Sequence, residues 1–116
     1  MHHDFNVDVS RDERGVVISV SGELDLATSP VLDAALIRAG AAAAERVILD
    51  LRNVSFMDST GLSVLVKAQR RATESHQLLA VMTGHDQVLR LLTLTGVADR
   101  LTLINAPERS PGTDAG

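Results

Sequence analysis

The chain has 116 residues, a length that suits one domain with a single modest core. Hydrophobic residues make up 45% of it and charged residues 22%, as in folded globular proteins. A net charge of −4 without a basic stripe argues against general binding to nucleic-acid phosphates, and the lack of Tyr and Trp argues against base stacking. The absence of cysteine excludes disulfides, thiolate metal sites and a thiol nucleophile.

Neither a membrane span nor a secretion signal is visible in the sequence. No segment approaches the roughly 18 to 20 apolar residues that a transmembrane helix needs. The first residues lack the basic start and apolar stretch of a signal peptide. We therefore expect a cytoplasmic protein.

The first half of the chain predicts a hairpin, a helix and a buried strand. Residues 5–10 alternate between apolar and polar, residues 16–21 are rich in β-branched side chains, and a polar turn ending in Gly15 joins them. The Gly-Glu-Leu-Asp segment at 22–25 is expected to break the second strand. The Thr-Ser-Pro segment at 28–30 predicts a helix start, with a hydroxyl cap followed by proline, and the helix is expected to run from Pro30 to about Ala43. The apolar run at 46–51 predicts a central strand buried on both faces.

The second half predicts two more helices and two strands. A loop is expected at 53–58, followed by a helix that begins near Ser59 and ends at about Thr73. Residues 77–83 predict a buried strand, residues 84–86 the start of a helix that runs through Leu94 and ends at Gly96, and residues 101–104 a short edge strand. Residues 105–116 contain two prolines and two glycines and are expected to form a flexible tail.

These elements follow the order β-β-α-β-α-β-α-β. Strands that alternate with helices indicate an α/β fold with parallel pairing. We therefore expect one domain over residues 1–104, with a mixed, mostly parallel sheet of four to five strands and helices packed on it.

The segment at 56–62, Phe-Met-Asp-Ser-Thr-Gly-Leu, is the candidate functional site. It connects a central strand to a helix and so lies at the carboxyl end of the sheet, where open α/β sheets tend to bind ligands. Asp58 suits an N-cap, and Ser59 would then be an exposed first helical residue beside the positive end of the helix dipole. Gly61 would leave the first turn bare, so that another protein could approach. The same residues also suit a plain helix cap, and the pattern alone leaves both interpretations open.

The helix after Ser59 offers a second clue. Residues spaced for one broad apolar face are Leu62, Leu65, Val66, Ala68, Gln69 and Ala72. This assignment predicts that Ser63, Val64 and Lys67 lie on the polar side. Val64 would then be an exposed apolar spot within a docking patch.

The segment at 56–62, with the strand before it, resembles the signature of STAS domains, and most closely that of the bacterial anti-sigma factor antagonists. Residues 22–25 are similar to the family's turn after the second strand, and residues 91–97 to the end of its third helix. The resemblance covers roughly residues 5–104.

The resemblance implies a partner-switching cycle. The unphosphorylated protein would bind an anti-sigma factor, which is a serine kinase with a histidine-kinase-like ATPase fold, and so free the sigma factor. Phosphorylation at Ser59 would end this binding, and a serine phosphatase would restore it. The free protein is expected to be a monomer. The residues expected to bind the partner are Asp25, Asp58, Ser59, Thr60, Gly61, Ser63, Val64 and Lys67.

Other functions find less support in the sequence. A serine hydrolase would need a base near Ser59, yet only His76 and His85 are available beyond the N-terminal pair, and the Gly-x-Ser-x-Gly motif is absent. No metal-ligand spacing and no phosphate-binding loop are present. We expect no catalytic residue, no metal and no cofactor. The remaining alternative is a freestanding STAS subunit that serves as an interaction module in a stress-signalling scaffold or a lipid-transport assembly.

Overall fold

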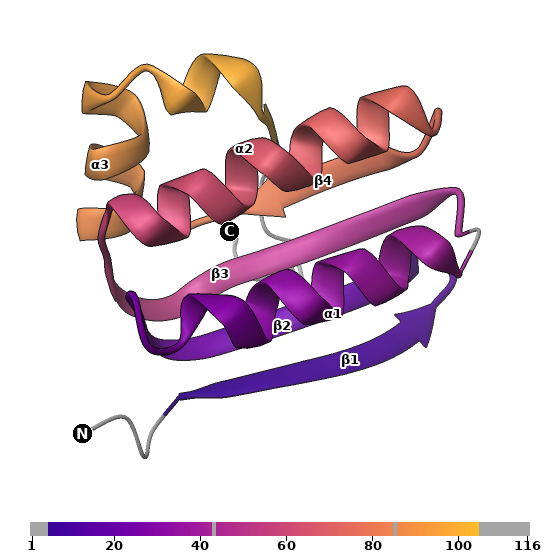
Figure 1. Cartoon of the computed structure of the whole chain (residues 1–116), viewed down its shortest axis with the longest axis horizontal. Coiled ribbons are helices and arrows are strands. Elements are labelled where there is room, and N and C mark those ends of the chain that lie inside the picture. Colours follow the sequence, from indigo (N-terminus) through magenta and orange to yellow (C-terminus); the bar gives the residue numbers. More distant parts are fainter. Residues whose placement is uncertain (1–4, 43, 85, 105–116) are drawn as a thin grey trace, which may run out of the picture.

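A five-stranded sheet with helices packed on it forms the fold (Figure 1). The computed structural model describes residues 5–42, 44–84 and 86–104. The strands are β1 (Asn6–Asp12), β2 (Gly15–Leu24), β3 (Arg46–Met57), β4 (Leu78–Met82) and β5 (Thr102–Leu103). The helices are α1 (Ser29–Ala41), α2 (Ser59–Glu74), α3 (Gln87–Leu94) and a short 3₁₀ helix, η1 (Val97–Arg100).

The strands lie in the sheet in the same order as in the chain. β1 pairs antiparallel with β2, and β2, β3, β4 and β5 pair parallel to their neighbours. Gly15 makes the hairpin possible, because its φ of 122° is strained for any residue with a side chain and an added Cβ would collide with the carbonyl oxygen of Arg46. The predicted α/β class, element order and mixed sheet are confirmed.

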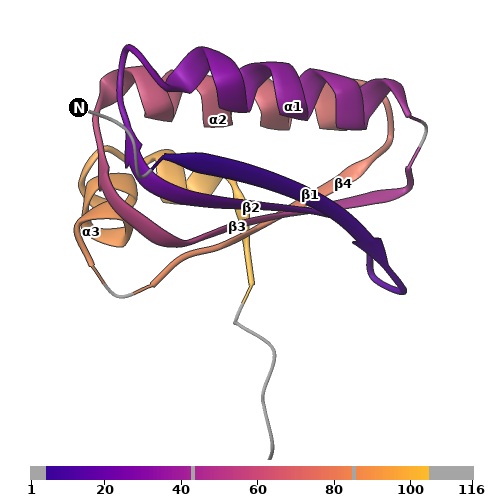
Figure 2. The same cartoon turned by 90° about the horizontal axis from the view of Figure 1, so that it is seen from below.

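The two long helices cover the same face of the sheet. α1 and α2 lie side by side above it, whereas α3 lies at the end of the sheet where β3 leads into α2 (Figures 1 and 2). The main core lies between the sheet and these helices and is built from aliphatic side chains. Its fully buried members include Ile18, Leu24, Leu32, Leu49, Leu51, Leu65 and Leu92. Val17, Ile48, Ala80 and Met82 form a second buried cluster on the other face.

Two central strands are longer than predicted. β2 continues through Leu24 instead of breaking at residue 22, and β3 continues through Met57 instead of ending in a loop at residue 53. The reason is that the two strands pair with each other over this stretch, with Leu24 opposite Met57. The expectation of a flexible tail at 105–116 concerns residues outside the described part. No helix within that described part is long and apolar enough to span a membrane.

Candidate functional site

The site is formed where the ends of β2 and β3 meet. The backbone N–H of Asp58 donates to the carbonyl of Leu24 over 3.2 Å, so the loop after β2 lies beside the start of α2. The hydroxyl oxygens of Ser29 at the start of α1 and Thr60 at the start of α2 are 3.4 Å apart. The structure therefore brings Asp25 and residues 58–61 together at the carboxyl end of the sheet, as the sequence predicts. We call this region the Ser59 end of the sheet.

Asp58 is the N-cap of α2. Its Oδ1 accepts from the backbone N–H of Thr60 over 2.9 Å and from that of Gly61 over 3.4 Å. The Thr60 hydroxyl donates to the same oxygen in a short hydrogen bond. The prediction of a capping role is confirmed, and all of the hydrogen bonds described for this carboxylate come from the first turn of α2.

Ser59 differs from both of its neighbours. It is the first residue of α2 and is exposed, and its hydroxyl makes no hydrogen bond to any described residue. Thr60, in contrast, is half-buried and its hydroxyl is directed to Asp58. Of the two adjacent hydroxyls, Ser59 is thus the one that another protein can reach.

Gly61 has a different role from the one predicted. It is buried, and a Cβ at this position would lie 2.7 Å from Cγ of Met57 and 3.1 Å from Cδ2 of Leu24. The residue therefore lets α2 approach the ends of β2 and β3. The expectation that it exposes a bare turn to a partner is wrong, because this side of the turn faces the core.

The exposed face of α2 is rotated from the predicted one. Val64 is only 7% exposed and belongs to the main core, so its prediction as an apolar spot on the surface is wrong. The physical reason is α1, which packs beside α2 and buries a flank that a sheet alone would leave open (Figure 2). We name the exposed residues Ser59, Ser63, Lys67 and Arg70 the α2 stripe.

Asp25 organises the loop between β2 and α1. Its Oδ1 accepts from the backbone N–H groups of Ala27 and Thr28 over 3.0 and 3.1 Å. The Thr28 hydroxyl donates to the carbonyl of Glu23 over 2.7 Å and makes no cap to the helix. The predicted hydroxyl cap of α1 is wrong, because Thr28 holds the N-cap position but directs its hydroxyl to the preceding loop.

Gln87 was not predicted to belong to the site. Its side-chain amide lies 30 residues from Met57 in sequence and bonds both backbone groups of that residue, each over 3.0 Å. An unpaired buried backbone group costs about 1–3 kcal/mol, so this double contact secures the end of β3. A glutamine after a capping aspartate carries no sequence signal for such a contact.

Exposed apolar side chains also occur in the segments that adjoin Ser59 at this end of the sheet. Leu26, in the loop after β2, is 75% exposed, and Phe56, near the end of β3, is 42% exposed. Exposed apolar residues in the segments that adjoin an accessible hydroxyl suit a protein partner better than a small substrate.

The described residues at this end of the sheet offer neither a histidine to act as a general base nor a set of metal ligands. His76 lies beyond the other end of α2, a helix about 24 Å long at 1.5 Å per residue, and His85 lies outside the described residues. No cluster of metal-ligating side chains occurs among the residues that the structure describes. A hollow of about 270 Å³ between α1 and α2, lined by Gly40, Arg71 and Gln77 among others, lies at the end of the helices far from Ser59.

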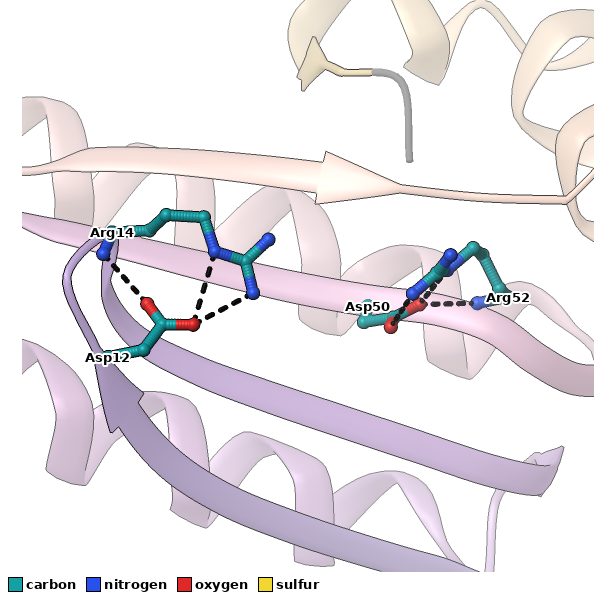
Figure 3. Close-up of polar contacts among 4 residues, drawn as sticks. All are labelled: Asp12, Arg14, Asp50 and Arg52. Carbon is teal, nitrogen blue, oxygen red and sulfur yellow. Dashed lines mark hydrogen bonds and ion pairs between the residues drawn. The ribbon is translucent and has the colours of Figure 1, made fainter. Parts of the chain in front are cut away.

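The ion pair of Asp50 and Arg52 lies on the face of the sheet opposite α1 and α2 (Figure 3). Arg52 donates to both carboxylate oxygens of Asp50, over 2.9 and 2.8 Å. Burial acts to raise the pKa of Asp50, but the hydrogen bonds from Arg52 and the attraction of Arg52 and Arg14 outweigh it and hold the pKa below its ordinary value. Figure 3 shows the more exposed pair of Asp12 and Arg14 on the same face.

Known proteins resemble this chain over most of its length. An anti-sigma-B factor antagonist of Bacillus subtilis (strain 168) is 31% identical over 109 residues, which cover 94% of this chain and 96% of the relative. The crystal structure of an anti-sigma factor antagonist from Mycobacterium paratuberculosis matches with a TM-score of 0.79 and 27% identity, covering 85% of this chain and 84% of that one.

SpoIIAA, an anti-sigma factor antagonist, shares the fold. Its unphosphorylated form matches with a TM-score of 0.74 at 22% identity, covering 89% of this chain and 90% of that one. Its phosphorylated form matches with a TM-score of 0.67 at 21% identity, covering 90% of this chain and 92% of that one.

The match to a family model extends over the whole sheet and all its helices. The model of the STAS domain matches residues 6–109. STAS anti-sigma factor antagonists are regulatory binding proteins and not enzymes. The chain belongs to the STAS domain proteins of the bacterial anti-sigma factor antagonist family.

Proposed function

We propose that this protein is an anti-sigma factor antagonist whose binding is switched by phosphorylation of Ser59. In the unphosphorylated form it binds an anti-sigma factor, a serine kinase with a histidine-kinase-like ATPase fold, and thereby releases a sigma factor. Phosphorylation of Ser59 ends the binding, and a serine phosphatase restores it. The cycle takes place in the cytoplasm, and the free protein is a monomer. The Bacillus subtilis relative, named an anti-sigma-B factor antagonist, supports the class of partner.

The accessibility of one hydroxyl carries this proposal. Ser59 is exposed and its hydroxyl has no partner among the described residues, whereas Thr60 donates its hydroxyl to Asp58. A kinase needs an acceptor hydroxyl that can enter its active site without breaking the fold. Ser59 meets this requirement and Thr60 does not.

The charges around Ser59 favour an effect on the interface and not on the fold. A phosphoryl group adds about −1.5 to −2 charges at neutral pH, and a helix N-terminus accommodates negative charge. On α2 the nearest cation toward the C-terminus is Lys67, about 12 Å away along the helix axis, so it cannot form an internal ion pair with the phosphate. The added charge and its hydration shell therefore remain at the surface that the partner would have to desolvate.

The proposed binding surface surrounds Ser59. Exposed Ser63 and Lys67 continue it along the α2 stripe, and half-buried Asp25 and Thr60 border it on the neighbouring loop and first turn. Leu26 and Phe56 add exposed apolar area. Asp58 and Gly61 act beneath this surface, since the first caps the helix and the second allows its close packing.

Phosphorylation can be tested with purified anti-sigma kinases from the same genome, ATP and Mg²⁺. Intact-mass spectrometry of the product should show one added phosphoryl group on the unaltered protein and none on Ser59→Ala. Ser63→Ala is the matched control, because Ser63 is also exposed on α2, one turn further along. A Ser59→Ala protein that still gains a phosphate would contradict the assignment.

The switch itself can be tested with Ser59→Asp. We expect this variant to keep the thermal stability of the unaltered protein, since the new carboxylate lies at a helix N-terminus, and to lose binding to the kinase in calorimetry. Ser63→Asp, which places the same charge one turn away, should retain more of the binding. Equal affinity of Ser59→Asp and the unaltered protein would instead favour a constitutive STAS subunit of a larger assembly.

A further inference from the structure

The end of β3 lacks a neighbouring strand on one side. The last residue of β3 that pairs with β4 is Asp50, opposite Met82, yet β3 continues to Met57. On its other side β3 remains paired with β2, where the N–H of Asp58 donates to Leu24. The N–H and C=O of Met57 therefore need partners in the space beyond the end of β4.

Gln87 supplies both partners from another element. Its Oε1 accepts from the Met57 N–H over 3.0 Å, and its Nε2 donates to the Met57 carbonyl over 3.0 Å. The residue begins α3, whose own N-terminus is fixed by Asp86, a cap that accepts from the N–H of Val88 over 3.1 Å. The side-chain amide thus acts as a one-residue substitute for a strand and ties α3 to the end of β3.

Met57 transmits this contact to the start of α2. It directly precedes the N-cap Asp58, so the orientation of its carbonyl sets the direction in which the chain enters the helix. Its side chain also packs beneath the first turn, where a Cβ on Gly61 would lie 2.7 Å from Met57 Cγ. Ser59 lies between these two points of attachment.

We propose that Gln87 is a positioning residue for Ser59, which holds the Met57 peptide, and with it the first turn of α2, in the orientation that the kinase and the binding partner recognise. This inference rests on the proposed function of Ser59. The amide is the required chemistry, because one contact needs an acceptor and the other a donor. Glutamate at this position keeps the acceptor and loses the donor, and leucine loses both.

Gln77 provides a matched control. It is also half-buried, and its side-chain Nε2 donates to a backbone carbonyl, that of Ala44, at the opposite end of α2. Gln77→Leu therefore removes a comparable contact far from Ser59 and the end of the sheet that surrounds it. Gln87→Leu and the nearly isosteric Gln87→Glu are the test variants, and the second remains informative if the first does not fold.

Two measurements test the inference on the full chain. In ¹⁵N–¹H spectra of the free protein, both Gln87 variants should shift the amide signals of residues 57–61, and Gln77→Leu should leave them in place. With a kinase that phosphorylates the unaltered protein, kcat/KM should fall by about tenfold in Gln87→Leu and less in Gln87→Glu, because small misplacements of a reacting group cost one to two orders of magnitude. Gln77→Leu should remain within about twofold of the unaltered protein, since its loss does not displace a reacting group.

The outcomes separate the inference from the function on which it rests. If Ser59 is phosphorylated equally fast in all variants, or if the signals of residues 57–61 do not move, the role of Gln87 is overturned and the switch stands. An equal loss of rate in Gln77→Leu also overturns it, since the effect would then be one of general stability. If no kinase phosphorylates Ser59 in the unaltered protein, the proposed function fails, and the inference fails with it.

Discussion

Two aspartates on the face of the sheet opposite α1 and α2 each form an ion pair with an arginine two residues further along the chain, but their environments differ. Asp50 lies on the central strand β3 and is 8% exposed, whereas Asp12 lies at the end of the edge strand β1 and is exposed. Both carboxylates have a lowered pKa. In Asp50 this occurs against the effect of burial, and in Asp12 it follows from the hydrogen bonds of Arg14. Only the buried pair should therefore matter for stability.

We expect Asp50→Asn to lower the free energy of unfolding by about 1–3 kcal/mol at pH 7, because it removes the negative charge and one of the two acceptor oxygens that Arg52 contacts. Since the folded-state pKa of Asp50 is lowered, its contribution is present above the ordinary value of 3.8 and is lost as the pH falls through the folded pKa. Urea unfolding between pH 7 and pH 3 should show that the difference between the two proteins shrinks in acid. Asp12→Asn is the control and should leave stability unchanged, and an equal effect of both variants would contradict the role of burial.

Two glycines in helices are expected to respond to alanine with opposite signs. At Gly61 a new Cβ would meet Met57 and Leu24, so Gly61→Ala should destabilise the fold by about 1–3 kcal/mol through overpacking. At Gly40 the nearest atom to a new Cβ is Oε1 of Gln77 at 3.8 Å, so Gly40→Ala should stabilise α1 by about 0.5–1 kcal/mol. Thermal unfolding of both variants measures this. A stabilised Gly61→Ala would contradict the predicted steric clash of its Cβ with Met57 and Leu24.

Among the elements, α2 carries the candidate site and depends most on its beginning. One carboxylate oxygen of Asp58 holds two backbone N–H groups and a hydroxyl of the first turn. The sequence leaves open whether Asp58 caps the helix or also positions Ser59 for a kinase. The capping geometry favours the first role.

Asparagine at position 58 separates these two roles. Because its side-chain oxygen caps helices as well as aspartate does, Asp58→Asn should retain both stability and phosphorylation, whereas Asp58→Ala should lose about 0.5–2 kcal/mol of stability. Chemical denaturation and the kinase assay of Ser59 together measure the outcome. A stable Asp58→Asn protein that is no longer phosphorylated would assign the carboxylate a direct role toward the kinase.

For the molecule as a whole, the edges of the sheet bear on its oligomeric state. The long edge strand β1 is almost entirely exposed and carries Asp8, Arg11 and Asp12, and the other edge, β5, has only two residues. Charged and short edges oppose strand pairing between molecules. Light scattering across a range of concentrations should therefore find a monomer. A dimer that dissociates on substitution of β1 residues would contradict this expectation.

Much of the architecture follows from local patterns in the sequence. Apolar runs predict the strands at 46–51 and 77–83, and Asp58 predicts the start of α2, since a cap joins residues only two or three positions apart. The exposure of Ser59 follows from the same local geometry. The predictions that prove wrong include the exposure of Val64 and Gly61 and the ends of β2 and β3, which depend on elements remote in sequence. The predicted hydroxyl cap of α1 is also wrong, because the Thr28 hydroxyl donates to the preceding loop.

Local chemistry was thus sufficient to locate the capped helix start and its serine, because caps, turns and strand periodicity involve neighbours along the chain. The assembled fold was needed for three further features: the packing of α1 against Val64, the extension of β3 beyond β4, and the contact of Gln87 with Met57. Each of these arises between segments about 30 residues apart in sequence, which the fold brings together. The periodicity of the sequence carries no signal for such contacts. The exposed serine can therefore be predicted from the sequence, whereas the contacts that hold the start of its helix are known only from the tertiary structure.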